Sequence, residues 1–335
     1  MRQLPRTLLA LAVLAAAAGL GGAVGSAGTG RPLRIGLVLD NTNVNDPFQH
    51  GAFVGLQRAV RKLGVVGKVV APSPRETFAS SFSYLARQRY DLIIAIGFFE
   101  VQDLDAAARA FPQSKFAIID ASIDDLKHRP GNVRGGTFRT EQAGYLAGYL
   151  AALMEERRPG KDVIGSVGGV KIPTVDSYIA GYRAGARSAD PRITLLNAYS
   201  GDFLNRSKCR AIALQQIAAG AGAVFQVADA CGLGALAAAK EKHVWGIGVD
   251  VDQSFLGPRN LTSVVKNLDV AVFATIASFK EGRFHTGTDA VFDLANDGVG
   301  LGSISPMVPR TFIRRLDAIR ARIVAGKITV PSSLG

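Results

Sequence analysis

The sequence predicts an α/β protein with two lobes, each built on a parallel sheet that helices cover on both faces. Short apolar runs alternate with amphipathic segments almost throughout the 335 residues. The runs are apolar at consecutive positions, as in parallel strands that are buried on both sides. About 305 residues follow a separate N-terminal segment, which is enough for two hydrophobic cores.

The elements follow one another in a regular order along the chain. Apolar runs predict the strands, and apolar residues at helical spacing predict the helices between them. The expected strands are 33–39, 68–71, 92–96, 116–119, 163–167, 194–198, 223–227 and 244–249. The expected helices are 51–63, 78–88, 142–155, 175–188, 207–219 and 233–242.

Two segments are expected to carry the chain between the lobes. The strand-like run 132–138 leads into a new helix near 138–140, and 261–267 would return the chain to the first lobe. Lobe 1 is therefore predicted to hold 31–138 plus about 262–295, and lobe 2 to hold 139–261 plus about 296–335. No low-complexity linker is visible, so we expect a hinge of crossing strands about which the lobes close on a ligand.

Polar or glycine-rich residues follow most of the predicted strands. Ligands of open parallel sheets bind beyond the carboxyl ends of the strands, so these residues are expected to face the binding site. They are Asp40, Gly97, Asp120, Gly168, Gly169, Ser200, Gly201, Ala228, Asp229 and Asp250.

The N-terminus has the order of a secretory signal peptide, predicted to occupy residues 1–27. Arg2 and Arg6 precede an apolar stretch at 8–20, and small residues follow at 23–27. An uncleaved membrane anchor is the alternative, but alanine and glycine dominate the stretch and favour membrane insertion weakly. No cysteine stands there to carry a lipid. A diffusible, periplasmic protein is therefore expected.

The chain is basic, with a formal charge of +12 that becomes 12 − 2 = +10 once Arg2 and Arg6 are removed. The basic residues are scattered among acidic ones and form no block with interleaved aromatics. Nucleic-acid binding is therefore not predicted. A solvated basic surface, able to attract anionic lipids or a partner, fits better.

The two cysteines, Cys209 and Cys231, leave two alternatives open. In an exported protein they could form one disulfide, and free buried thiols are the other interpretation. No histidine lies near either in the sequence, so neither is predicted to be a nucleophile.

The sequence contains no recognisable motif for cofactor binding, metal binding or catalysis. The glycine-rich segments 165–169 and 231–234 lack the lysine and the spacing of a phosphate loop. The four histidines form no ligand-spaced pair. No catalytic residue, metal ligand or cofactor is therefore predicted, and an enzyme is unsupported.

A series of short phrases runs in a fixed order from residue 33 to about 331. In that order they resemble the basic membrane protein (BMP) family of ABC-transporter substrate-binding proteins, which includes purine-nucleoside receptor lipoproteins. The phrases are GLVLD at 36–40, NDPFQ at 45–49, GL at 55–56, FAIID at 116–120, NVRGGTFR at 132–139, Glu141, AGYLAG at 143–148, VGG at 167–169, GYRAG at 181–185, VFQV at 224–227, GLG at 232–234, IGVDVDQ at 247–253, TSVVK at 262–266 and GVGL at 298–301.

The resemblance implies a periplasmic-binding-protein fold of type I, with two Rossmann-like lobes joined by a multi-strand hinge. It also implies a function: capture of a purine nucleoside by lobe closure and delivery to an ABC permease in the inner membrane. A monomer that binds no nucleic acid is expected. Because no lipidation cysteine is present, this chain would be a soluble relative of proteins that are often tethered to the membrane.

The resemblance also assigns roles to individual residues. It implies two aromatic side chains that stack on the base and a set of polar side chains that contact the ligand. Phe48 and Phe203 would stack on the base, although Leu204–Asn205 stands where the family usually has Asn-Asp. Asp120 would accept a hydrogen bond from the base, because an ionised carboxylate only accepts. Asp250 would accept from the ribose hydroxyls, with Asp252 as the weaker candidate.

Lys266 would donate to the sugar, with Asp250 or Asp40 as its charged partner, because a buried ammonium needs one. Asp40, Asn45 and Asp46 would line the first lobe. Gly232 would let the backbone approach the ligand closely.

Three rival functions are also compatible with the sequence. The ligand could be a free purine base or another small heterocycle, which would leave Asp250 and Lys266 dispensable. A nucleoside hydrolase or phosphorylase could use an aspartate as its general base. A sensor could present the closed clamp to a receptor instead of a permease.

Overall fold

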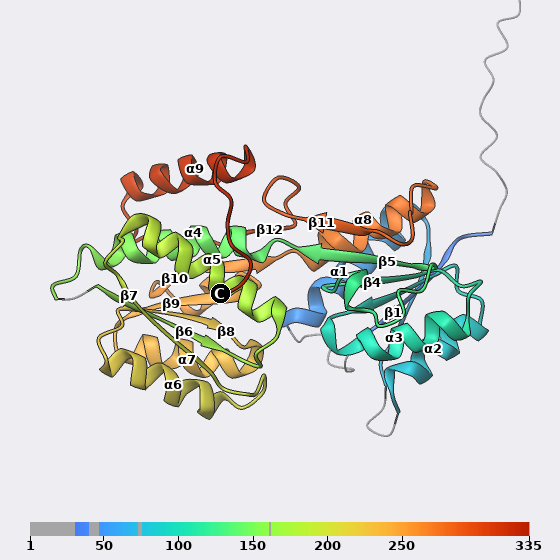
Figure 1. Cartoon of the computed structure of the whole chain (residues 1–335), viewed down its shortest axis with the longest axis horizontal. Coiled ribbons are helices and arrows are strands. Elements are labelled where there is room, and N and C mark those ends of the chain that lie inside the picture. The colour runs from blue at the N-terminus through green and yellow to red at the C-terminus, as the bar shows by residue number, and fades with distance from the viewer. Residues whose placement is uncertain (1–30, 40–46, 73–75, 161, 335) are drawn as a thin grey trace, which may run out of the picture. The chain divides into compact units, whose positions relative to one another are not determined.

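Two six-stranded sheets form the framework of the protein (Figure 1). The computed structural model describes residues 31–39, 47–72, 76–160 and 162–334. The predicted signal peptide and the site candidates Asp40, Asn45 and Asp46 lie outside the described residues. Each sheet, together with the helices that pack on it, makes one lobe of the unit that begins at Pro32.

The first sheet has the strand order β11-β5-β4-β3-β1-β2, and every pair of neighbours is parallel. Helices α1 and α8 pack on one face, and α2 and α3 on the other. The elements are β1 (Arg34–Val38), α1 (Pro47–Leu63), β2 (Val66–Val70), α2 (Phe78–Arg87), β3 (Leu92–Ile96), η1 (Phe98–Glu100), α3 (Val101–Ala110), β4 (Phe116–Ile119), η2 (Ile123–Asp125), β5 (Val133–Phe138), α8 (Leu268–Lys280) and β11 (Asp289–Phe292).

The second sheet has the order β12-β10-β9-β8-β6-β7, parallel except for the antiparallel edge strand β12. Helices α4 and α5 cover one face, and α6 and α7 the other. The elements are α4 (Thr140–Glu155), β6 (Val163–Gly168), α5 (Pro173–Ala189), β7 (Thr194–Tyr199), α6 (Arg206–Ala218), β8 (Ala223–Val227), α7 (Asp229–Glu241), β9 (Trp245–Asp250), η3 (Ser254–Leu256), β10 (Asn260–Lys266), β12 (Val299–Leu301) and α9 (Arg310–Val324).

Three crossings join the lobes. The chain passes to the second lobe after β5, returns after β10, and passes over again between β11 and β12. The second crossing lies later than predicted, because residues 262–266, expected in lobe 1, belong to β10. This strand pairs in register with β9, Thr262 opposite Ile247 and Val265 opposite Asp250, so it completes the second sheet before the chain leaves.

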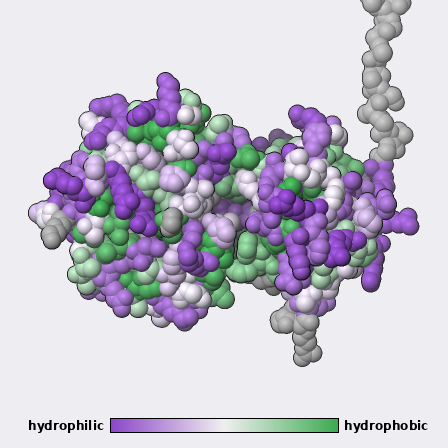
Figure 2. Space-filling model, in the orientation of Figure 1, coloured by the Kyte–Doolittle hydropathy of each residue, from purple (hydrophilic) through white to green (hydrophobic). Residues whose placement is uncertain are grey.

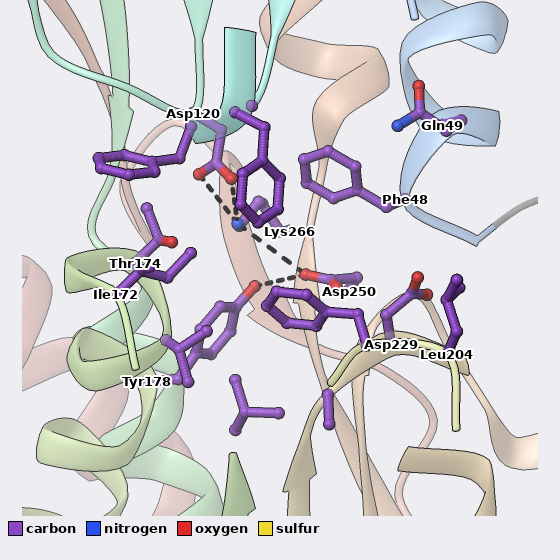
Figure 3. A pocket seen from close by; sticks show the side chains of 17 residues that line it. Phe48, Gln49, Asp120, Ile172, Thr174, Tyr178, Leu204, Asp229, Asp250 and Lys266 are labelled. Carbon is purple, nitrogen blue, oxygen red and sulfur yellow. Dashed lines mark hydrogen bonds and ion pairs between the residues drawn. The ribbon is translucent and has the colours of Figure 1, made fainter. Parts of the chain in front are cut away.

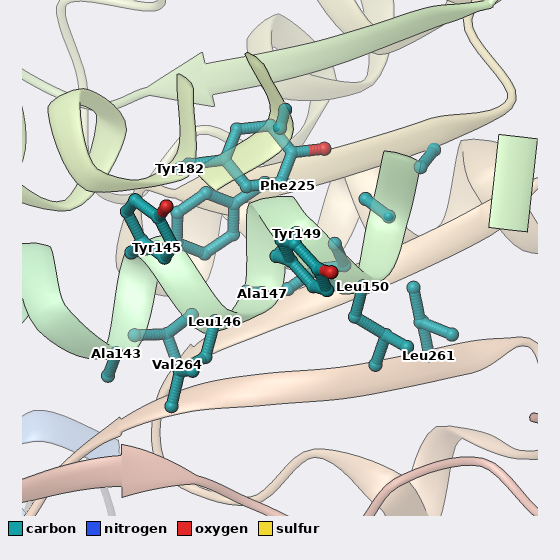
Figure 4. Packing of buried hydrophobic residues seen from close by; sticks show 14 of the residues in the cluster. Ala143, Tyr145, Leu146, Ala147, Tyr149, Leu150, Tyr182, Phe225, Leu261 and Val264 are labelled. Carbon is teal, nitrogen blue, oxygen red and sulfur yellow. The ribbon is translucent and has the colours of Figure 1, made fainter. Parts of the chain in front are cut away.

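Helices α4 and α5 pack with their backbones almost in contact, in the core that Figure 4 shows. A Cβ atom at Gly148 would lie 1.8 Å from the carbonyl oxygen of Tyr182, and one at Gly181 would lie 2.0 Å from that of Glu141. Only glycine leaves room for such an approach. The glycines of the phrases at 143–148 and 181–185 therefore serve helix packing.

On the opposite face of this sheet, Cys209 of α6 and Cys231 of α7 form a disulfide. Both cysteines are fully buried among small apolar residues. Of the two alternatives, a disulfide and free buried thiols, the structure contains the disulfide, which links the two helices covalently. No helix among the described residues is long and apolar enough to span a bilayer.

Candidate ligand-binding site

A cavity of about 210 Å³ lies between the lobes, where the surface is hollowed in Figure 2. Lobe 1 contributes the first turn of α1 and the ends of β3 and β4, and lobe 2 contributes α5 and the ends of β8, β9 and β10. The lining residues are Phe48, Gln49, Gly97, Phe98, Phe99, Asp120, Ile172, Thr174, Val175, Tyr178, Phe203, Leu204, Val227, Ala228, Asp229, Asp250 and Lys266.

Three aspartates of the lining have a left-handed backbone conformation. Asp120 directly follows β4, Asp229 begins α7 after β8, and Asp250 ends β9, and their φ angles are 72°, 47° and 63°. This region costs a residue other than glycine about 1 kcal/mol, although aspartate tolerates it better than most. Each strand thus turns sharply at its carboxyl end and leaves a carboxylate in the cavity.

Lys266 connects the two lobes through a buried ion pair (Figure 3). Its Nζ, at the end of β10, donates to both oxygens of Asp120 in lobe 1, at 2.9 and 2.8 Å. The same Nζ lies 4.0 Å from Oδ1 of Asp250, and the hydroxyl of Tyr178 donates to that oxygen at 2.8 Å. The side chains of Lys266 and Asp120 are only 4% and 8% exposed.

Burial changes the pKa of two acidic groups in this cluster, Asp120 and Tyr178. It raises the pKa of Asp120 above its usual value, while the charge and the hydrogen bonds of Lys266 act in the opposite direction. Burial also raises the pKa of Tyr178 well above its usual value, and the neighbouring carboxylate of Asp250 adds to this effect. Tyr178 is therefore a protonated donor at any ordinary pH.

Two aromatic side chains of the lining, Phe48 and Phe203, lie against glycines that follow strands. A Cβ atom at Gly97 would lie 3.4 Å from the Phe48 ring, and one at Gly169 would lie 2.4 Å from the Phe203 ring. Any side chain at Gly169 would therefore displace Phe203. The Phe203 ring also meets Phe99 of the other lobe edge to face, with centroids 6.1 Å apart.

The loop that carries Phe203 is fixed by Asp202. Oδ1 of Asp202 accepts from the backbone N–H groups of Leu204 and Asn205 at 2.8 and 3.0 Å, and Oδ2 accepts from Lys208 at 3.1 Å. The hydrogen bond from Leu204 is the largest of the effects that lower the pKa of Asp202 to about 2. Asn205 caps α6 by accepting from the backbone of Ser207. The departure at Leu204–Asn205 is thus part of a well-bonded turn.

Five candidates from the sequence line this one cavity, namely Phe48, Asp120, Phe203, Asp250 and Lys266. The charged partner of Lys266 differs from the expectation: Asp120 of the opposite lobe takes both hydrogen bonds, Asp250 stands farther off, and Asp40 is outside the described residues.

Two further candidates lie elsewhere. Gly232 is in the first turn of α7, where a Cβ atom would lie 1.8 Å from the Gln226 side chain, so this glycine serves packing. Asp252 accepts from Ser303 and from the backbone of Ser254 and is not a lining residue.

Several lining residues were not among the predicted site residues. Tyr178 occupies a buried position on α5, where the sequence pattern is that of a core residue. Phe99 lies in the one-turn helix η1, which no periodicity marks. Asp229 is one of the polar residues that follow predicted strands, and this position after a strand is the feature of the sequence that indicates its place in the cavity.

Comparison with known proteins extends over nearly the whole chain. A family model described as ABC transporter substrate-binding protein PnrA-like (Bmp) matches residues 33–333. The ABC transporter nucleoside-binding protein BmpA of Lactococcus lactis subsp. cremoris is 31% identical over 90% of this chain and 89% of its own length. Basic membrane protein A of Borreliella burgdorferi is 30% identical over 92% and 90%.

Solved structures confirm the predicted fold. An ABC transporter solute-binding protein from Aeropyrum pernix K1 superposes with a TM-score of 0.78 at 23% identity, over 91% of this chain and 94% of that one. A solute-binding protein from Actinobacillus succinogenes with bound D-allose has a TM-score of 0.62 at 13% identity, over 77% and 95%. These likenesses establish the periplasmic-binding-protein fold of type I. From the match over residues 33–333, the chain belongs to the Bmp family of PnrA-like ABC-transporter substrate-binding proteins.

Proposed function

We propose that this chain binds a purine nucleoside between its lobes and delivers it to an ABC permease in the inner membrane. The observation that carries the proposal is a single cavity that combines Phe48 and Phe203 with the buried cluster of Lys266, Asp120 and Asp250. A flat ring and a sugar require these two kinds of surface. The Lactococcus relative is named a nucleoside-binding protein, which supports the same ligand class.

The base is proposed to stack on Phe48 and Phe203. Stacking of one base on one aromatic ring contributes about 1–3 kcal/mol. Asp120 would accept a hydrogen bond from a ring N–H. Lys266 already donates to both of its oxygens, but a carboxylate has about four lone-pair positions, so Asp120 keeps capacity for a ligand donor.

The ribose is proposed to lie against Asp250 and Lys266. Tyr178 donates to Oδ1 of Asp250, which fixes the carboxylate and leaves Oδ2 as the oxygen proposed to accept from the sugar. Lys266 would donate its remaining N–H to a ribose oxygen. Asp40, Asn45 and Asp46 are proposed to complete the lobe 1 side of the site.

Delivery requires that the mature protein work outside the inner membrane. Substrate-binding proteins of ABC importers act there, which supports a periplasmic location and a permease as the partner. Removal of residues 1–27 and a monomeric state belong to the same proposal. The permease is expected to receive the ligand as the lobes open.

Calorimetry on purified protein, freed of bound ligand by unfolding and refolding, tests the proposal. Guanosine, adenosine and inosine should bind tightly, whereas uridine, guanine and ribose should bind weakly. Phe48→Ala and Phe203→Ala should each lower the affinity, and Phe255→Ala is the matched control, because Phe255 is 75% exposed and outside the lining.

Two results of the calorimetry, and one of product analysis on incubated ligand, would contradict the proposal. Guanine that binds as tightly as guanosine would replace the nucleoside by a free base. Tight binding of ribose alone would remove the role of the aromatic rings. Recovery of a cleaved ligand after prolonged incubation would make the protein an enzyme, since a binding protein returns its ligand unaltered.

A further inference from the structure

The lining of the cleft carries negative charge in a chain that is basic as a whole. Its charged side chains among the described residues are Asp120, Asp229, Asp250 and Lys266, so the formal sum is 1 − 3 = −2. The whole chain has a formal charge of +12. Because low-dielectric walls focus the field of the charges that line them, the cleft can select ligands by charge independently of the outer surface.

The single ammonium of this lining is already committed. Lys266 gives two hydrogen bonds to Asp120 at 2.9 and 2.8 Å, and it stands 4.0 Å from the nearer oxygen of Asp250. It therefore compensates Asp120 first. Asp229 lies, in the view of Figure 3, on the opposite side of Asp250 from Tyr178, beside Leu204. Asp229 and Asp250 therefore add two further carboxylates to the lining beside the pair of Lys266 and Asp120.

The aromatic side chains, like the carboxylates, favour a positively charged ligand. Phe48, Phe98, Phe99 and Phe203 line the cavity, and the face of an aromatic ring attracts positive charge. Lys266 already uses this attraction, because its Nζ lies 5.4 Å from the centre of the Phe48 ring. A site that combines aromatic rings with carboxylates is suited to bind a flat organic cation, because both kinds of group attract positive charge.

Asp229 shares a left-handed backbone with two other carboxylates of the lining. Its φ of 47° lies in the region where glycine is at ease and other residues are strained. Such outliers persist where the surroundings require them, and they cluster at functional sites. Asp120 and Asp250, the two other left-handed residues of the lining, are residues of the proposed site.

We propose that Asp229 is a specificity-determining residue that makes the site favour purine nucleosides with a positively charged ring and reject phosphorylated ones. The inference rests on the proposed function and names the ligand class within it. A cationic ring gains attraction from Asp229, Asp250 and the ring faces. A nucleotide brings its phosphate into a cavity that already has an excess of carboxylates.

Two probes of equal shape separate charge from size. 7-Methylguanosine carries a positive charge on its five-membered ring, and 7-methyl-7-deazaguanosine places the same methyl group on a neutral ring. At mildly acidic pH, where the charged probe keeps its N1 proton, calorimetry should show it binding about tenfold tighter than the neutral probe. Guanosine 5′-monophosphate should bind at least about tenfold more weakly than guanosine.

Asp229→Asn tests the assignment to one residue. Asparagine also tolerates this backbone region, so the fold is retained while the charge is lost. The preference for the charged probe should fall several-fold in this variant and should be unchanged in Asp297→Asn. Asp297 is the matched control, because it also has a positive φ, of 57°, yet its side chain is 83% exposed and outside the lining.

Each outcome has a distinct meaning. Equal binding of the two methylated probes, with guanosine still bound, would overturn the charge preference and leave the proposed function standing. A preference that survives unchanged in Asp229→Asn would remove Asp229 as its source. Failure of every nucleoside to bind would overturn both proposals.

Discussion

Replacing Lys266 by methionine should destabilise the protein strongly, because it leaves a carboxylate buried without its cation. Asp120 is 8% exposed and would lose two hydrogen bonds to an ammonium, of 2.9 and 2.8 Å. Removing one partner of a buried ion pair typically costs about 3–5 kcal/mol. We expect the free energy of unfolding of Lys266→Met to fall by an amount in that range near neutral pH.

The loss should depend on pH in a defined direction. Burial already raises the pKa of Asp120, and Lys266, which opposes the rise, is absent in the variant. The folded-state pKa of Asp120 then lies further above its unfolded value of 3.8. A carboxyl with a raised folded pKa costs nothing below the unfolded pKa, and its cost grows as the pH rises from the unfolded to the folded pKa, above which it is constant. The deficit of Lys266→Met should therefore shrink as the pH is lowered towards 4.

Urea unfolding, followed by the fluorescence of the single tryptophan Trp245, measures both effects. Lys171→Met is the matched control, because Lys171 is 63% exposed in its pair with Asp176 and such pairs contribute at most about 1 kcal/mol. Adding Asp120→Asn to Lys266→Met should restore all but about 1–2 kcal/mol. A deficit below about 1 kcal/mol, or a double variant as unstable as the single one, would refute the reasoning.

Three further predictions concern stability and affinity. Replacing both Cys209 and Cys231 by alanine opens a loop with a sequence separation of 22 and should cost about 3 kcal/mol in urea unfolding; an unchanged midpoint would contradict this. Gly148→Ala should cost at least about 2 kcal/mol, because its Cβ would lie 1.8 Å from a carbonyl oxygen, whereas Gly131→Ala, with nothing within 4 Å, should be nearly neutral. Tyr178→Phe should weaken nucleoside binding about tenfold in calorimetry, since Asp250 loses a donor at 2.8 Å; equal affinity would exclude a positioning role.

The sequence predicts the repeating part of the fold well and its crossings less well. Strands such as β3 and β4 are continuous apolar runs because helices cover both faces of the sheets, and that pattern is local. The sequence of the run at 261–265 fits a strand in either lobe, and only its pairing with β9 assigns it to the second sheet. The composition of this run therefore does not determine its lobe, and the pairing of strands in the folded protein does.

The site likewise contains residues that can be predicted from the sequence and residues that cannot. Asp120 and Asp250 are predictable, because polar residues that follow buried parallel strands gather at one edge of each sheet. Tyr178 is not, because a buried aromatic on a helix has the sequence pattern of a core residue. The partner of Lys266 is also out of reach, since Asp120 is 146 residues away in the other lobe.

The candidate site and the hinge share one residue, Lys266. Phe138 ends β5 at the first crossing, Lys266 ends β10 at the second, and Phe292 ends β11 at the third. The Nζ of Lys266 lies 5.7 Å from the centre of the Phe138 ring, and the Phe138 and Phe292 rings pack with centroids 5.2 Å apart. The ammonium of Lys266 is therefore close to the side chain at the first crossing, and Phe138 connects it to the side chain at the third. We therefore expect that a substitution that breaks the ion pair between Lys266 and Asp120 changes ligand affinity and the arrangement of the lobes together.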